Sequence, residues 1–147
     1  MRPVHRQPQL GFSLLEVLIA VLILSFGLLG IAALQTNALK NNQSAFQRSQ
    51  ATMLAYYMLD AMRANRDAAM IASYNLSKTC SAPATGSLIT NDQAAWISAL
   101  KTNLGNLNST CGEITCNVTS CTVKVYWDDS RGLGGASTQT VEIKTRL

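Results

Sequence analysis

An uninterrupted apolar run near the N-terminus constrains this chain more than any other feature. Eighteen of the 23 residues from Phe12 to Leu34 are hydrophobic, compared with 49 of the 113 residues from Gln35 to Leu147. A helix needs about 20 apolar residues to cross the hydrocarbon core of a bilayer, at about 1.5 Å per residue. The run is therefore long enough to span a membrane, and we expect a polar domain to follow it.

Positive charge precedes the apolar run and is missing directly after it. Arg2 and Arg6 lie before the run, and the next cationic residue is Lys40. The positive-inside rule then places the N-terminus in the cytoplasm and the rest of the chain across the membrane. A cleaved secretory signal peptide is the alternative interpretation. Two observations count against a signal peptide. The apolar region of a signal peptide usually has only roughly 7–15 residues, and the nearest match to its cleavage site here, residues 30–33, is imperfect.

Glu16 is an acidic residue inside the apolar run. A carboxylate at the centre of a bilayer costs on the order of 2.5–3.5 kcal/mol, so it needs a partner. No Lys or Arg lies within two helical turns on its C-terminal side. The partner would then be an amine at the start of this chain or of another, and cleavage just before Phe12 would create such an amine.

The stretch from Gly11 to Glu16 reads Gly-Phe-Ser-Leu-Leu-Glu and leads into the apolar run. This pattern resembles the class III signal of type IV prepilins and type II secretion pseudopilins. The resemblance implies that a prepilin peptidase cuts between Gly11 and Phe12 on the cytoplasmic face and N-methylates the new Phe12 amine. It also implies that Glu16 neutralises the Phe12 amine of a neighbouring subunit during assembly. Because a buried carboxylate and ammonium are tolerable only when paired, this would favour subunits in register.

The pattern after the apolar run predicts that the helix continues to about Met70. No proline occurs between Leu10 and Ala82, and no glycine between Gly30 and Gly86, so nothing breaks the helix. Side chains recur along it at helical spacing, which predicts one face packed on a globular head. These positions are Leu28, Ile31, Gln35, Leu39, Phe46, Met53, Leu54, Tyr57, Met58, Ala61 and Met62.

The remaining residues predict a short helix and a small sheet. Residues 65–90 have the composition of a variable connection, and Asn91 and Asp92 are expected to cap a helix that ends near Leu104. From Ile114 the apolar period becomes two, which predicts three antiparallel strands with one buried face. The expected fold class is α+β, the type IV pilin-like fold. Its parts would be a leader at 1–11, a membrane or filament-core helix at 12–35, the rest of the long helix at 36–70, and a periplasmic head at 71–147.

Four cysteines lie in the part expected outside the membrane: Cys80, Cys111, Cys116 and Cys121. An even number in an oxidising compartment favours two disulfides, for which three connectivities are possible. Cys116 and Cys121 could face one another across a short hairpin, which would leave Cys80 for Cys111. A zinc site is the weaker alternative, because the spacings fit poorly and no histidine lies in the head.

The composition argues against an enzyme and against a nucleic-acid-binding protein. The single histidine, His5, precedes the apolar run, so histidine-based catalytic or metal sites are not available in the head. Asp128 and Asp129 are adjacent carboxylates, which we interpret as part of a solvated turn that extends to Gly135. The net charge of +4 comes from 12 cationic and 8 acidic residues, and the cationic residues occur singly. No cofactor, metal or nucleic acid is expected.

Several short stretches also resemble the PilV-type minor pilins of type IV pili: residues 13–20, 27–30, 33–35, 62–66 and 123–128. The resemblance implies a low-abundance subunit, held by inner-membrane lipid with its head in the bacterial periplasm. It would start pilus assembly with other minor pilins and the major pilin and contribute to adhesion or twitching motility at the cell surface. A minor pseudopilin of a type II secretion system is the first alternative. A single-pass anchored periplasmic protein that never assembles is the second.

Overall fold

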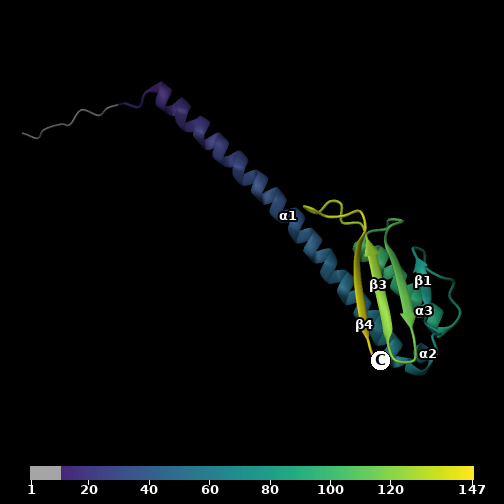
Figure 1. Cartoon of the computed structure of the whole chain (residues 1–147). Helices are drawn as coiled ribbons and strands as arrows, with labels where there is room; N and C mark the ends of the chain where they lie inside the picture. The colour runs from purple at the N-terminus through teal and green to yellow at the C-terminus, as the bar shows by residue number, and fades with distance from the viewer. Residues whose placement is uncertain (1–10) are drawn as a thin grey trace, which may run out of the picture. The chain divides into compact units, whose positions relative to one another are not determined.

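The structure is a computed structural model that describes residues 11–147; the cationic residues of the expected leader, at 2 and 6, lie outside the described residues. It confirms the α+β class: a long N-terminal helix packs on a small antiparallel sheet (Figure 1). The elements are α1 (Leu14–Ala64), α2 (Arg66–Met70), β1 (Leu76–Thr79), α3 (Leu88–Leu104), β2 (Cys111–Cys116), β3 (Cys121–Trp127) and β4 (Gln139–Thr145). The chain divides into two compact units, Met1–Ala38 and Leu39–Leu147.

The first unit contains the start of α1. Ser13 precedes the helix; its hydroxyl accepts a hydrogen bond from the Leu15 amide at 3.3 Å, and its carbonyl accepts one from the Glu16 amide at 3.0 Å. Serine is a favoured N-cap residue because it satisfies amides that have no partner inside the helix. α1 is long and apolar enough to cross a membrane, and none of the side chains in its most apolar stretch is buried within the chain.

In the second unit, one face of α1 forms part of the hydrophobic core. Its buried residues follow the helical repeat: Ala51, Leu54, Ala55, Met58, Leu59 and Met62. Our prediction of a single packed face was wrong for Leu39, Phe46, Met53 and Tyr57, which are 69%, 60%, 55% and 50% exposed. These side chains lie on nearly the opposite side of α1 from the buried row, because the helix turns by about 100° per residue. Periodicity alone did not separate the two apolar rows.

The end of the long helix also differs from the prediction. α1 stops at Ala64, and Asn65 (φ −123°, ψ 52°) separates it from the five-residue helix α2. The Asn65 side chain donates a hydrogen bond to the hydroxyl of the buried Tyr74 at 3.2 Å. Asparagine favours such local side-chain bonds over the helix interior, which explains the break without a glycine or a proline.

The sheet has the order β1-β2-β3-β4, with every pair antiparallel. The three predicted strands are present, and along β3 the side chains alternate between buried and half-buried, with Val123, Val125 and Trp127 in the core. The fourth strand, β1, falls in the segment that we predicted to be a variable connection. It has only four residues, pairs with β2 through a register shift and buries no side chain fully, so it carries little strand signal.

Helix α3 packs on the same core as α1. It begins earlier than predicted: Ser87 is the N-cap and forms a capping box with Thr90, so Asn91 and Asp92 are not the caps. Trp96 of α3 is fully buried, and its indole donates a hydrogen bond to the Leu54 carbonyl of α1 at 3.0 Å.

Two disulfides join the strands of the second unit. Cys80 bonds to Cys111, which ties the end of β1 to the start of β2, and Cys116 bonds to Cys121. Cys116 and Cys121 are directly opposite in the β2–β3 register, with Cα atoms 4.0 Å apart. This is the pairing that the hairpin argument favoured.

Candidate functional site

The expected cleavage site lies just before α1. Gly11 and Phe12 are both exposed, and a Cβ atom added at Gly11 would meet no other atom within 4 Å. The fold of the described residues therefore does not require a glycine at this position. A need for a small residue here would come from an enzyme that binds the segment, because nothing within the chain would clash with a larger side chain.

Glu16 lies in the first turn of α1, on the same side of the helix as Phe12. Both line an apolar groove along the helix, together with Val17, Ala20, Val21 and Leu24. Glu16 is exposed, and no ion pair engages it among residues 11–147. Its carboxylate is thus open to a partner from another chain, beside a groove formed by apolar side chains.

A local role for Glu16 must be considered beside this one. Acidic residues in the first turn interact favourably with the helix dipole, worth typically about 0.3–1 kcal/mol. Ser13 and Glu16 also have the spacing of a capping box, in which the acid would accept from the Ser13 amide. In the structure the Ser13 hydroxyl accepts a hydrogen bond from the Leu15 amide, so the serine already caps the first turn of the helix.

Comparison with known families matches residues 6–32 to the prokaryotic N-terminal methylation motif. No curated protein and no solved structure matches the chain. The matched segment contains Gly11, Phe12 and Glu16 together with most of the apolar run. The motif and the α+β architecture support a type IV pilin-like protein that is processed by a prepilin peptidase, and they point to a structural protein rather than an enzyme. The apolar helix fits an inner-membrane anchor.

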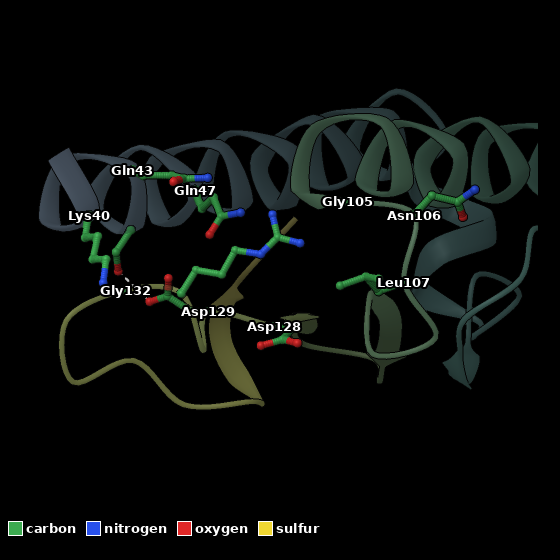
Figure 2. Close-up of a pocket in the computed structure, with 11 residues that line it drawn as sticks. Lys40, Gln43, Gln47, Gly105, Asn106, Leu107, Asp128, Asp129 and Gly132 are labelled. Atoms are coloured by element: carbon green, nitrogen blue, oxygen red, sulfur yellow. Dashed lines mark hydrogen bonds between the residues drawn. The ribbon is translucent and has the colours of Figure 1, made fainter. Parts of the chain in front are cut away.

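A separate polar pocket lies in the second unit (Figure 2). One wall is a face of α1, another is the turn after α3, and the third is the loop after β3. Its volume is about 190 Å³. It is lined by Lys40, Gln43, Ser44, Gln47, Gly105, Asn106, Leu107, Asp128, Asp129, Arg131 and Gly132.

Asp129 fixes the loop of this pocket to α1. The residue is 4% exposed, and its carboxylate accepts a hydrogen bond from the Ser44 hydroxyl. The loop closes through the Asp129 amide, which donates to the Ala136 carbonyl at 3.0 Å, and a Cβ atom at Gly135 would lie 1.9 Å from the Asp129 carbonyl oxygen. Our interpretation of both aspartates as a solvated turn was therefore wrong for Asp129. No local signal shows this, because Ser44 is 85 residues away in the sequence.

Asp128 has a different environment from its neighbour. Its carboxylate accepts a hydrogen bond from the Ser130 amide at 2.8 Å, which lowers the pKa of Asp128 below its ordinary value; the nearby Arg131 contributes in the same direction. Asp128 is therefore ionised at neutral pH. The two carboxylates therefore accept hydrogen bonds from different donors, the Ser130 amide and the Ser44 hydroxyl.

The other titratable side chains with shifted pKa values have structural contacts. Burial raises the pKa of Tyr126 to about 12, and the hydrogen bond that its hydroxyl donates to Glu113 at 2.7 Å is the second cause. The ammonium of Lys78 lies 4.1 Å from the centre of the Tyr126 ring. Burial also raises the pKa of Tyr74, whose hydroxyl donates to Asp92 at 2.8 Å. These contacts join strands of the sheet and link Tyr74 to α3.

Proposed function

We propose that this chain is a minor pilin of a type IV pilus, cut between Gly11 and Phe12 and assembled through its N-terminal helix. The observation that carries the proposal is the methylation motif at residues 6–32, with Glu16 exposed in the first turn of the helix. After cleavage, the methylated Phe12 amine would be one helical turn from Glu16 of its own chain. It would also be free to pair with Glu16 of a neighbour.

A carboxylate–ammonium pair between subunits suits the surroundings of Glu16. The groove beside it is formed by apolar side chains, so an isolated charge there would be poorly solvated in lipid or in a filament core. A correctly placed Phe12 amine from a neighbour would neutralise it. A misregistered subunit would leave both charges unpaired.

A second observation favours assembly over an anchored protein that stays alone. Within the second unit, α1 carries an exposed apolar stripe of Leu39, Phe46, Met53 and Tyr57, spaced seven, seven and four residues apart. This spacing is typical of helices that pack against other helices. Exposed apolar surface of this kind marks sites of interaction with proteins or membranes.

Mass spectrometry of the mature protein tests the processing step. We expect an N-terminus at Phe12 with one methyl group, and we expect Gly11→Val to block cleavage. Gly27→Val is the matched control, because a Cβ atom at Gly27 also meets nothing within 4 Å, and it should be cleaved normally. An intact Met1, or a cut near Ala33, would reject the prepilin class.

We assign the chain to a pilus and not to a type II secretion system because of the PilV-like stretches. Deletion of the gene tests this assignment. Met62 from one stretch and Trp127 from another are fully buried, so these stretches contribute to the core of the head. We expect deletion of the gene to reduce surface pili while type II secretion continues. Normal piliation with a secretion defect would instead indicate a pseudopilin.

A further inference from the structure

The polar pocket of the second unit suggests a binding activity that goes beyond assembly. We propose that it binds one neutral sugar residue, such as the terminal residue of a glycan. The proposal depends on three properties of the pocket: free hydrogen-bonding groups, zero net charge and a small, fixed volume.

The pocket presents polar side chains that are not used by the fold. Within residues 11–147, no side-chain hydrogen bond or ion pair engages Lys40, Gln43, Gln47, Asn106 or Arg131, all of which line the cavity. Figure 2 shows Lys40 and Gln47 reaching from α1 toward the loop that carries Asp129. Gln47 is half-buried and the other four are exposed, so water is their present partner and a ligand could replace it.

The charges of the pocket balance. Two cations, Lys40 and Arg131, face two acids, Asp128 and Asp129. Each acid already accepts one hydrogen bond from the chain, from the Ser130 amide and the Ser44 hydroxyl respectively. A ligand with a net charge of either sign would therefore meet like charge as well as opposite charge. A neutral ligand avoids this conflict.

The free groups match the hydrogen bonding of hydroxyls. The glutamine and asparagine amides each offer donors and an acceptor, the cations offer donors, and the carboxylates offer spare acceptor positions. A sugar hydroxyl donates one hydrogen bond and accepts others, so neighbouring hydroxyls on a ring can use both kinds of group. Leu107, which is 42% exposed, adds an apolar surface for the C–H face of a ring.

Size and rigidity limit the ligand further. The volume of about 190 Å³ is smaller than ordinary small-molecule sites of roughly 300–1,000 Å³. This suits a single ring rather than an oligosaccharide or a peptide. The Ser44–Asp129 hydrogen bond and the close approach of Gly135 hold the loop in place, so binding would not require the loop to become ordered.

Saturation-transfer NMR on the full-length protein tests the proposal. The micelles should be lauryldimethylamine oxide, because the sugar head groups of glycoside detergents would compete. The probes are the methyl glycosides of glucose, galactose, mannose and N-acetylglucosamine, with glucuronate and glucosamine as charged analogues. We expect saturation transfer to at least one neutral glycoside at millimolar concentration, and weaker transfer to the charged analogues.

Variants locate the binding. Gln47→Ala removes one ordinary hydrogen-bonding partner and should weaken binding about fivefold, whereas Arg131→Ala should weaken it by about tenfold or more. Gln50→Ala is the matched control: it lies one turn further along α1, outside the pocket, and should bind as the unchanged protein does. No transfer to any neutral glycoside, transfer only to a charged analogue, or equal binding by Gln47→Ala would overturn the proposal. None of these outcomes bears on the cleavage at Gly11, so the proposed pilin function is judged separately.

Discussion

Substitution of Glu16 separates its two possible roles, because glutamine can replace glutamate in a helix cap but not in an ion pair. Glu16→Gln keeps a side-chain acceptor at the third position of α1, where a capping box uses either residue. It removes the negative charge. Glu16→Ala removes both. If Glu16 serves only its own helix, the glutamine variant should assemble normally. If Glu16 pairs with an amine of another subunit, both variants should fail.

Substitution of Glu16 should lower incorporation into filaments strongly if Glu16 pairs with another subunit, and only slightly if Glu16 serves its own helix. Loss of a favourable acid at a helix N-terminus costs typically about 0.3–1 kcal/mol. Removal of one partner of a buried ion pair costs about 3–5 kcal/mol, because the other charge stays buried without compensation. At about 1.4 kcal/mol per factor of ten, this lowers incorporation by more than about a hundredfold. The apolar side chains around Glu16 support the larger value.

The assay compares sheared filaments with the membrane fraction of the same cells by immunoblotting. We expect Glu16→Gln and Glu16→Ala to accumulate in the membrane with Phe12 as their N-terminus, and to be absent from filaments. Glu142→Gln is the matched control, because it neutralises an exposed acid whose ion pair with Lys124, at 3.6 Å, should contribute less than about 1 kcal/mol. Incorporation of Glu16→Gln at the level of the unchanged protein would refute the pairing role.

Three further predictions concern the head, each measured by denaturant unfolding of the full-length protein. Gly112→Ala should destabilise it by about 1–3 kcal/mol, since the new Cβ atom would lie 2.5 Å from the Trp96 ring. Loss of the Cys80–Cys111 disulfide, whose cysteines have a sequence separation of 31, should cost about 4 kcal/mol in the chain-entropy model. The pKa of Tyr126 is raised to about 12 in the folded protein, above an unfolded value of 10.0. Its contribution to the free energy of unfolding is therefore complete below pH 10 and is lost as the pH rises through 12. Tyr126→Phe should make the free energy of unfolding fall less steeply over this range.

Each of these predictions has its own control. Gly86→Ala should be nearly neutral, because a Cβ atom there meets nothing within 4 Å; a similar loss for both glycines would contradict the steric argument. Loss of the Cys116–Cys121 disulfide, with a separation of only 5, should cost about 2 kcal/mol by the same model, and a larger loss than for the other disulfide would contradict it. For Tyr126→Phe, an unchanged slope between pH 10 and 12 would show that the tyrosine is not responsible.

The sequence predicted those features that depend on local patterns. The long apolar helix follows from a run without breakers, and strands β3 and β4 follow from alternation over seven residues each. The disulfide pairing followed because Cys116 and Cys121 share the apolar phase of two strands joined by a short turn. The expected processing site rests on a contiguous motif, so the order of residues along the chain is enough to indicate it.

The features that the sequence did not predict depend on distant contacts. Met53 and Leu54 are neighbouring apolar residues on α1, and only the packing of the head determines that Leu54 is buried. Strand β1 exists because β2 offers it an edge, and its own four residues carry little signal. The burial of Asp129 depends on Ser44 from another element. The polar pocket depends on the same contact and could not be expected from the adjacent aspartates.

The surfaces of the sheet and of α1 differ in a way that indicates where partners bind. On the outer face of the sheet, Glu113 accepts from Tyr126, Lys78 lies over the same ring, and Lys124 pairs with Glu142. These five side chains, which lie on a polar face, have partners within the chain. Helix α1 instead exposes both its apolar N-terminal run and the separate stripe that includes Phe46 and Met53. Since burial of apolar surface drives association, we expect protein and lipid partners to bind this helix rather than the outer face of the sheet.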